Sequence, residues 1–520
     1  MQTAEDGLIT ASVPLLQRWH QQVQARPRHM AFIDGPQAID HAALWVGAMA
    51  WCARLSRHMQ AGDRVALLMD NSARTASVGY GAWAAGGVWV ALNTALKPDD
   101  LLWQLQHCGA KVLVHGDKYA AVAEKAAALG IQVLPNDACD ETLADPSIAP
   151  AFSAFDMPDA TQAAAIIYTS GTTGKPKGVM LTHGNLAANV SAIQQTLPMQ
   201  ADDVTLCLLP FFYAFGFSVL HTHLTLGATL VLQHSLMYPQ QVLQKMAETH
   251  ATAFYGVPSS YYLLMERGQL AQARLPSLRY VAQAGGAMDA ARIDEVRRLL
   301  PGVDFYVMYG QTEACSRLTT LPAHRLSDKP GSVGLPLPGV ALSIQSEQGA
   351  LLPAGQTGEV CAQGANVMAG YWQAPQDTAA TLQHGWLRTG DLGHLDEEGF
   401  LFLTGRLREQ IKTGAHRVSP WEIEEVIRPL AGVREVAAIG APDPLLGETV
   451  HVFVMADAPS DALRRIILQT CKAQLASYKV PKAVSFLSDF PRTASGKVQK
   501  HLLAATLATP PAEPTSHHDA

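Results

Sequence analysis

The sequence lacks paired cysteines, clustered basic residues and an uninterrupted apolar stretch of membrane length. Its seven cysteines are scattered along 520 residues without a C-x-x-C pair. This distribution argues against a disulfide framework and a zinc site, and it favours reduced thiols in a cytoplasmic protein. The formal net charge is -7 and no basic block is present, so there is no electrostatic reason to expect nucleic acid as a partner.

Two uncharged stretches, residues 76–96 and 204–232, are long enough to cross a bilayer. Glycines interrupt the first stretch, and the second contains Pro210 and two histidines. We therefore expect both to form buried helix and strand, and we expect no integral membrane segment. The first residues also lack the basic-then-apolar pattern of a signal peptide.

The length of the chain predicts more than one domain, because one hydrophobic core usually organises about 250–300 residues. We expect an α/β protein. Its large N-terminal domain, residues 1–406, would contain parallel or mixed sheets with helices plus a small β subdomain. A smaller, mobile α+β domain would follow over residues 407–508. The proline-rich, polar residues 509–520 are expected to form a disordered tail.

The segment TSGTTGKPKG, from Thr169 to Gly178, holds three glycines, four hydroxyl side chains and two lysines. Backbone N–H groups, hydroxyls and positive charge with little bulk are suited to phosphate. The segment does not fit G-x-x-x-x-G-K-[ST], because Gly171 and Gly174 are only three positions apart and proline follows Lys175. Taken alone, it also fits an ordinary surface turn.

From about residue 160 to 310, short apolar runs alternate with helix-like segments, which is typical of a parallel sheet. The TSGTTGKPKG segment, AGGAMD at 284–289 and YGQTEA at 309–314 each follow an apolar run. Because ligands bind beyond the carboxyl ends of parallel strands, we expect these loops to share one sheet edge and one ligand. Glu313 is a candidate magnesium ligand, although a surface position and an ordinary AGGAMD turn remain open.

Beyond residue 330, glycine and proline separate short apolar runs, which indicates a small β subdomain. A helix is then predicted to begin with Ser419 as N-cap, Pro420 at the first position and Glu422 completing a capping box. Residues 433–456 are expected to form two strands joined by a turn, followed by an amphipathic helix. Lys497, in PRTASGKVQK, lies on a predicted loop, where a lone lysine is more often a solvated charge.

Together these stretches resemble the ANL superfamily of adenylate-forming enzymes, which includes acyl-CoA synthetases, nonribosomal-peptide adenylation domains and beetle luciferases. The resemblance spans most of the chain and rests on GDRVALL at 62–68, YTSGTTGKPKGVMLTHGN at 168–185, MYGQTEA at 308–314, GYW ending at 372, GWLRTGDLG at 385–393, GRLREQIK at 405–412 and PRTASGKVQK at 491–500. It implies that a carboxylic acid attacks ATP, with Mg²⁺, to give an acyl-adenylate and pyrophosphate. A thiol, commonly coenzyme A, then displaces AMP.

The resemblance also implies roles for individual residues. The phosphate loop would consist of Thr169, Ser170, Gly171, Thr172, Thr173, Gly174 and Lys177. Contacts to the nucleotide would come from Thr312 at the α-phosphate, Glu313 through magnesium, Tyr309 on adenine beside Gly285 and Gly286, and Asp391 and Arg406 at the ribose. Lys497 would stabilise the charge that develops in the first half-reaction. The small domain would pivot near Arg408, and Lys412 would then face the site for the second half-reaction.

The acyl pocket is expected to be lined by Phe211, Phe212, Tyr213, Gly216, Val257 and Ala284. These aromatic and small residues suggest an aryl or short-to-medium aliphatic acid. Gly216 replaces the aspartate that binds the ammonium group in amino-acid-activating domains, so an α-amino acid is disfavoured. Tyr213 stands where many acyl-CoA synthetases have histidine, which alters a predicted contact to the substrate carboxylate. Arg317 either binds a second substrate carboxylate, or it pairs structurally or faces solvent, and we favour the second interpretation.

The sequence thus favours an ATP-dependent acid:CoA ligase. The alternative is a stand-alone adenylation enzyme that passes the acyl group to the phosphopantetheine thiol of an acyl carrier protein. Ala415, where glycine is usual, either narrows the thiol tunnel or is harmless, and we favour the second reading. A non-catalytic nucleotide sensor is disfavoured because Glu313, Asp391, Arg406 and Lys497 are all present.

Overall fold

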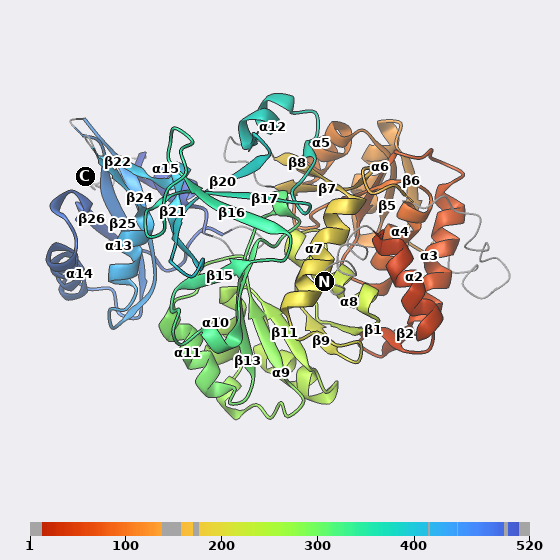
Figure 1. The fold of residues 1–520 in the computed structure, drawn as a ribbon, viewed down its shortest axis with the longest axis horizontal. Coiled ribbons are helices and arrows are strands. Elements are labelled where there is room, and N and C mark those ends of the chain that lie inside the picture. The colour runs from red at the N-terminus through yellow and green to blue at the C-terminus, as the bar shows by residue number, and fades with distance from the viewer. Residues whose placement is uncertain are drawn as a thin grey trace, which may run out of the picture. The chain divides into compact units, whose positions relative to one another are not determined.

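The computed structural model describes residues 13–137, 158–169, 176–413, 416–444, 446–492 and 498–508. The chain forms two compact units (Figure 1). The larger comprises Met1–Ser343, Cys361–Thr389 and Glu398–Leu401, and the smaller comprises Ile344–Val360, Gly390–Glu397 and Phe402–Ala520. The predicted α/β class, with a large N-terminal sheet-containing part and a smaller C-terminal part, is confirmed.

A seven-stranded sheet in the larger unit has the order β18-β8-β7-β4-β3-β5-β6. Strands β3 to β7 are parallel to their neighbours, whereas β8 and β18 add antiparallel pairs at one edge. The bounds are β3 (Arg64–Leu68), β4 (Val88–Ala91), β5 (Ala110–His115), β6 (Gln132–Pro135), β7 (Ala163–Thr169), β8 (Lys177–Thr182) and β18 (Gly370–Tyr371).

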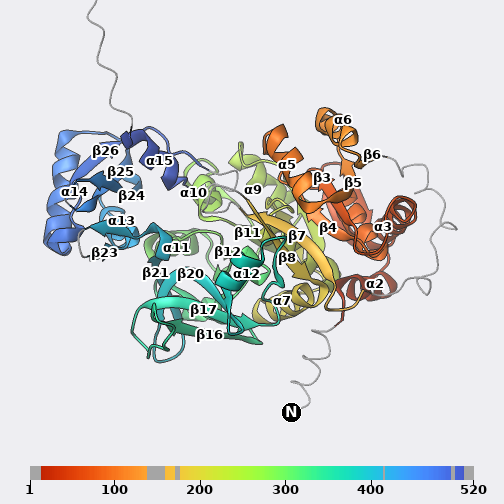
Figure 2. The same ribbon diagram turned by 90° about the horizontal axis from the view of Figure 1, so that it is seen from above.

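Helices cover both faces of this sheet (Figure 2). One face packs against α5 (Pro98–Cys108) and α6 (Ala120–Ala128). The other packs against α3 (His41–Leu55) and α4 (Ala73–Ala84). Because parallel strands are buried on both faces, they are continuous apolar runs in the sequence, as in the fully buried β4.

A second sheet in the larger unit has the order β15-β14-β13-β12-β11-β9-β10-β1-β2. From β13 to β1 the neighbouring strands are parallel. The bounds are β1 (Met30–Asp34), β2 (Gln37–Asp40), β9 (Val204–Cys207), β10 (Thr229–Leu232), β11 (Ala253–Gly256), β12 (Tyr280–Gln283), β13 (Asp304–Tyr309), β14 (Thr319–Leu321) and β15 (Ser332–Pro336).

One hydrophobic core joins side chains of both sheets to the helices between them. Among these helices, α7 and α8 pack against each other (Figure 1). The remaining bounds are α2 (Leu15–Ala25), α7 (His183–Thr196), α8 (Ala214–Leu226), α9 (Pro239–Glu248), α10 (Pro258–Glu266), α11 (Ala290–Leu299) and α12 (Pro375–Thr381).

The expectation that the three candidate loops share one sheet edge is wrong. The phosphate-loop segment follows β7 in the seven-stranded sheet, whereas AGGAMD and YGQTEA follow β12 and β13 in the other sheet. Alternating strands and helices indicate parallel pairing, but they do not determine which sheet each strand joins. The long helix α7 carries the chain from one sheet to the other.

The two uncharged stretches are buried secondary structure. Residues 76–96 contribute most of α4 and then β4, and residues 204–232 form β9, α8 and β10. In the parts of the chain that the structure describes, no helix combines the length and apolarity of a membrane span. The six described cysteines are buried free thiols, and Cys139 lies outside the described residues.

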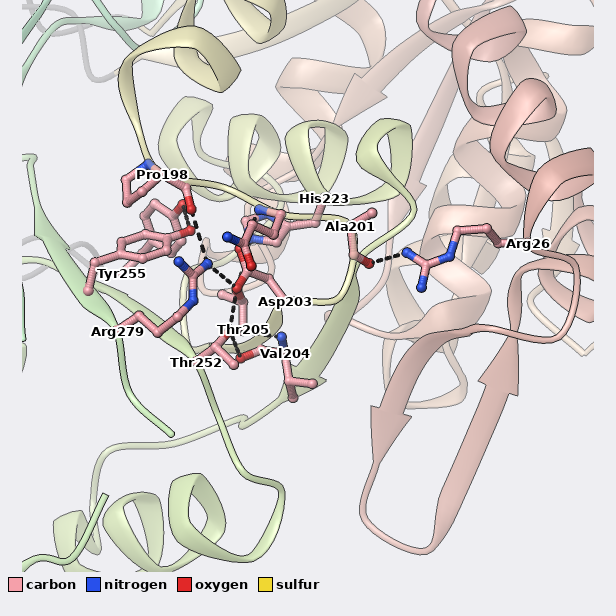
Figure 3. Close-up of polar contacts among 12 residues, drawn as sticks. Arg26, Pro198, Ala201, Asp203, Val204, Thr205, His223, Thr252, Tyr255 and Arg279 are labelled. Carbon is pink, nitrogen blue, oxygen red and sulfur yellow. Dashed lines mark hydrogen bonds and ion pairs between the residues drawn. The ribbon is translucent and has the colours of Figure 1, made fainter. Parts of the chain in front are cut away.

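A buried carboxylate fixes the starts of three parallel strands in the second sheet (Figure 3). Asp203, just before β9, is 1% exposed. Its Oδ1 accepts hydrogen bonds from Arg279 Nη2 and Thr252 Oγ1, each at 2.6 Å. Arg279 immediately precedes β12 and Thr252 immediately precedes β11, so this carboxylate helps to set the register of the strands that lead to the candidate site.

The strands β16, β17, β20 and β21 neighbour one another in that order, and each has residues in both units. The smaller unit also contains a separate sheet β23-β22-β25-β24 with β26 beside β25. The strand bounds are β16 (Val340–Gln345), β17 (Gly358–Gly364), β20 (Trp386–Leu395), β21 (Leu401–Arg406), β22 (Ile411–Thr413), β23 (His416–Val418), β24 (Val433–Asp443), β25 (Gly447–Ala456) and β26 (Ala483–Phe486). The helix bounds are α13 (Pro420–Ile427), α14 (Asp461–Gln474) and α15 (Lys500–Ala508).

Helix α13 begins where the sequence predicts, but the predicted capping box is wrong. Pro420 occupies the first turn, yet the Ser419 side chain makes no cap hydrogen bond. Its Oγ donates instead to the carbonyl oxygen of Thr404 at 2.6 Å, and Glu422 forms an ion pair with Lys479. Tertiary partners have therefore replaced the local contacts that the S-x-x-E pattern predicts.

Candidate active site

Glu313 is held at a junction between the two sheets of the larger unit. It lies in the short 3₁₀ turn Thr312–Ala314, which Gly310 and Gln311 separate from the end of β13. The Tyr371 hydroxyl donates to Glu313 Oε1 at 2.8 Å, and the backbone N–H of Met368 donates to the Glu313 carbonyl at 2.8 Å. Tyr371 belongs to β18, the edge strand beside β8. Burial and the neighbouring Glu313 charge raise the pKa of Tyr371, so the phenol stays protonated and donates.

Lys177 reaches the same tyrosine from β8. Its Nζ lies 5.0 Å from the centre of the Tyr371 ring and 2.5 Å from Asp377 Oδ1. Thr169 and Lys177 are directly opposed in the β7–β8 pair, so they close the base of the phosphate-loop segment. The other predicted phosphate-loop residues lie outside the described part of the chain: Ser170, Gly171, Thr172, Thr173 and Gly174.

A strained turn follows Glu313. Cys315 and Ser316 have φ values of 55° and 99°, which non-glycine residues rarely adopt. A Cβ at Gly310 would lie 2.1 Å from the carbonyl oxygen of Ser316, so only glycine fits where this turn folds back. The Asn189 and Asn366 side-chain amides donate to the Arg317 carbonyl at 3.0 and 2.9 Å. Strain held by surrounding contacts is frequent at functional sites.

The loops predicted to hold adenine follow two adjacent parallel strands. Tyr309 ends β13 and is 8% exposed, and Gly285 lies two residues past the end of β12. Gly285 has a φ of 84°, and a Cβ there would lie 3.2 Å from Val257 Cγ1. Gln283 Nε2 donates to the Gly286 carbonyl at 2.6 Å and so fixes the glycine pair.

The two residues predicted at the ribose meet within the smaller unit. Asp391 on β20 is 4% exposed, and its Oδ1 lies 2.8 Å from Nε of Arg406 at the end of β21. The N–H of Gly390, the preceding residue, donates to Glu359 Oε1 at 3.1 Å. The arginine thus orients a mostly buried carboxylate, which is the arrangement expected of a group that accepts hydrogen bonds from a diol.

The predicted pocket segment, Phe211 to Gly216, leads into α8. Asn71 holds its start, because Asn71 Oδ1 accepts from the Phe211 N–H at 2.8 Å. A Cβ at Gly216 would lie 2.1 Å from the Pro210 carbonyl oxygen, so this backbone excludes any side chain there, aspartate included. Phe212 and Tyr213 are only partly buried, and the Tyr213 hydroxyl accepts from Asn93 Nδ2 at 3.1 Å.

The structure describes some of the predicted catalytic and hinge residues of the smaller unit but not all of them. Lys412, on β22, is exposed, and its N–H donates to Glu448 Oε2 at 2.7 Å. Arg408 lies in the turn Leu407–Glu409, and its side chain is not described. Lys497 and Ala415 lie outside the described residues. Beyond the segment that contains Lys497, Lys500 Nζ lies 2.8 Å from Glu424 Oε1 and 3.1 Å from Glu409 Oε2.

A magnesium ion fits this site only in partnership with phosphate. Among the described residues, no group of three or more His, Cys, Asp or Glu side chains could hold a metal. Tyr371 engages Oε1 of Glu313, and no described side chain is bonded to its Oε2. One carboxylate oxygen, completed by phosphate oxygens and water, is a usual set of ligands for Mg²⁺.

Three residues that form these contacts were not predicted from the sequence: Tyr371, Asp377 and Asn366. Tyr371 had a sequence signal, because it is the tyrosine of the GYW motif. Asp377 and Asn366 had none, since each reaches its partner across the fold: Asp377 pairs with Lys177, and Asn366 donates to the Arg317 carbonyl.

The family profile of AMP-binding enzymes matches residues 19–372, and that of the AMP-binding enzyme C-terminal domain matches residues 422–497. The chain therefore belongs to the AMP-binding family of adenylate-forming enzymes. It is 32% identical to feruloyl-CoA synthase from an Amycolatopsis species over 458 residues, which cover 86% of this chain and 90% of that protein.

Solved structures of similar proteins match the fold of this protein over nearly the whole chain. The o-succinylbenzoate CoA synthetase of Bacillus subtilis, in complex with its acyl-adenylate intermediate, has a TM-score of 0.83 at 29% identity and covers 94% of this chain and 98% of that one. ATP-bound MatB from Rhodopseudomonas palustris has a TM-score of 0.87 at 32% identity and covers 95% and 99%. The protein is an acid–thiol ligase of the AMP-forming acyl-CoA synthetase type.

Proposed function

We propose that the protein joins an aryl or short-to-medium aliphatic carboxylic acid to coenzyme A through an acyl-adenylate formed from ATP. The observation that carries this proposal is the position of Glu313. Tyr371 fixes its carboxylate beside the carboxyl end of β13, next to the glycine pair that follows β12. A nucleotide with its metal ion can bind at the ends of parallel strands. Here these ends provide a fixed carboxylate and, at the glycine pair, backbone that no side chain covers.

The first half-reaction brings two anions together, so charge neutralisation is its main requirement. When bound through Glu313, Mg²⁺ supplies positive charge at the phosphate oxygens. Lys177 exchanges its partner Asp377 for phosphate, and the Thr312 hydroxyl donates to the α-phosphate. Lys497 donates at the oxygens where negative charge develops between the acid and the α-phosphate.

The remaining residues bind and orient adenosine. Tyr309 stacks on adenine, and the backbone of Gly285 and Gly286 lines its edge. Asp391 accepts hydrogen bonds from the ribose hydroxyls while Arg406 keeps its carboxylate oriented, as their 2.8 Å contact supports.

We propose that the working domains are residues 1–406 and 407–508. The second would turn about Arg408 between the half-reactions, so that Lys497 serves the first and Lys412 the second. The coenzyme A thiol then attacks the acyl carbon, and AMP leaves with the bonding electron pair.

The residues that line the predicted pocket support the class of acid. Phe211, Phe212 and Tyr213 supply aromatic surface, and the absence of a side chain at Gly216 leaves no partner there for a substrate ammonium group. The feruloyl and o-succinylbenzoate names of the similar proteins agree with an aryl acid.

Pyrophosphate release with a panel of aryl, short-chain, medium-chain and amino acids, each with and without coenzyme A, tests this proposal. We expect an aryl or aliphatic acid to release pyrophosphate and to give a CoA thioester by mass spectrometry. A thioester that forms only on an added phosphopantetheinylated carrier protein would overturn coenzyme A as the acceptor. An amino acid as the best substrate would overturn the proposed class of acid.

A further inference from the structure

Arg317 is a fully buried arginine whose positive charge has no anionic partner among the described residues. It is 1% exposed and ranks among the largest fully buried side chains. Its Nη1 donates to the thioether sulfur of Met308, and its Nε has no hydrogen-bond partner in the described part of the chain. Burial lowers the pKa of Arg317 to about 10, so the guanidinium remains charged at neutral pH. A thioether is a weak acceptor and does not offset the desolvation of a charge.

Other donors near this guanidinium also lack partners. Thr320 lies directly opposite Met308 in the β13–β14 pair, so both side chains are on the same face. Like Arg317 Nε, the buried Thr320 Oγ1 and Ser316 Oγ have no hydrogen-bond partner among the residues that the structure describes. One buried cation and two buried hydroxyls, all able to donate, form a set that an anionic group would satisfy.

The three donors, on Arg317, Thr320 and Ser316, lie beside the predicted acyl pocket. Arg317 lies over the ring of Phe215, 5.6 Å from its centre, and Phe215 is a partly buried residue of the predicted pocket segment. The carbonyl of Arg317 is fixed by the Asn189 and Asn366 amides. The strained turn therefore presents Glu313 at one end and a preorganised cation four residues later.

We propose that Arg317 binds a second carboxylate on the acid substrate, with Thr320 and Ser316 as additional donors. The inference rests on the proposed ligase function and narrows its substrate class to acids that carry an anionic group away from the reacting carboxylate. A neutral acceptor such as a hydroxyl would satisfy hydrogen bonds but would leave the buried charge uncompensated. Phe215 then supplies an apolar wall between the two ends of the substrate.

Acid-dependent exchange of pyrophosphate into ATP tests the inference with matched substrates: hexanoate against adipate, and phenylacetate against its para-carboxylated analogue. We expect at least one diacid to exceed its monoacid partner in kcat/KM. In Arg317→Gln, activity on that diacid should fall on the order of 100-fold, with little change on the monoacid. Arg317→Lys should restore part of it, and the surface control Arg292→Gln should behave like wild type. A monoacid preference in the wild-type enzyme would overturn the inference.

Stability supplies a second readout that does not need turnover. Removal of an uncompensated buried charge should leave the melting temperature of Arg317→Met equal to that of wild type or higher. The favoured diacid alone, without ATP, should raise the melting temperature of wild type but not of Arg317→Gln. A large fall in melting temperature for Arg317→Met would identify a structural arginine and overturn the inference. If no acid supports exchange while a diacid still stabilises wild type, the proposed function fails and the anion site stands.

Discussion

The hydroxyl of Tyr371 donates a 2.8 Å hydrogen bond to the carboxylate of Glu313 and so joins an edge strand of one sheet to the strand-end turn of the other. Tyr371 lies on β18 and Glu313 in the turn Thr312–Ala314 that follows β13, so the hydrogen bond fixes the carboxylate across the two sheets. The proposed nucleotide site of the larger unit is built on this contact.

Tyr371→Phe should therefore weaken the proposed use of magnesium while the fold survives. Loss of a hydrogen bond that orients a metal ligand typically costs about 10–100-fold in metal affinity or activity. We expect kcat to fall in that range and the Mg²⁺ concentration for half-maximal activity to rise. Tyr238→Phe, at an exposed position, is the matched control. An unchanged magnesium titration would show that Tyr371 does not position the metal ligand.

Buried neutral histidines should make the protein acid-sensitive. Burial lowers the pKa of His183, His41 and His223 to about 4 and that of His221 to about 3. Below pH 6.5 the unfolded chain binds protons that the folded protein excludes, so the free energy of unfolding falls as the pH drops from about 6.5 to about 4. Each such histidine contributes about 1.4 kcal/mol per pH unit within that window.

Urea unfolding at pH 7.5 and 5 measures this slope. The slope is proportional to the number of protons that the chain takes up on unfolding. His183→Gln should lower that number by about one, whereas His58→Gln, at an exposed position, should leave it unchanged. Equal stability of the wild-type protein at both pH values would contradict the buried, neutral state of these histidines.

Two adjacent aspartates should differ strongly in their effect on stability. Asp203 is buried against Arg279 and Thr252 (Figure 3). The neighbouring Asp202 pairs with Arg26 and has 80% of its side chain exposed. Asp203→Asn should lower the free energy of unfolding by about 3 kcal/mol, because it leaves a buried network unpaired. Asp202→Asn should cost less than about 1 kcal/mol. Equal losses in urea unfolding would contradict a role for Asp203 in setting strand register.

Local patterns in the sequence predict many elements of this fold correctly. The apolar run that precedes the TSGTTGKPKG segment forms β7, and residues 433–456, predicted as two strands joined by a turn, form the paired strands β24 and β25. Each of these elements depends on periodicity and turn residues that are close together in the chain. The same holds for Pro420, whose restricted φ suits the first turn of a helix.

Contacts between distant segments explain what the sequence does not predict. The assignment of β7 to a different sheet from β13 depends on strand pairing across the fold. Ser419 makes no cap hydrogen bond, and its hydroxyl donates to the carbonyl of Thr404, a partner that the local sequence pattern does not indicate. Arg317 was expected to pair or to face solvent, yet it is buried with no anionic partner among the described residues, and only the packed structure reveals this.

The two half-reactions, measured separately in Lys497→Ala, test the central claim most directly. One assay follows acid-dependent pyrophosphate release from ATP, and the other supplies a synthetic acyl-adenylate with coenzyme A and detects the thioester. The account predicts that the variant loses pyrophosphate release, still binds ATP and still converts the supplied adenylate into thioester. Near-normal pyrophosphate release by Lys497→Ala would contradict it.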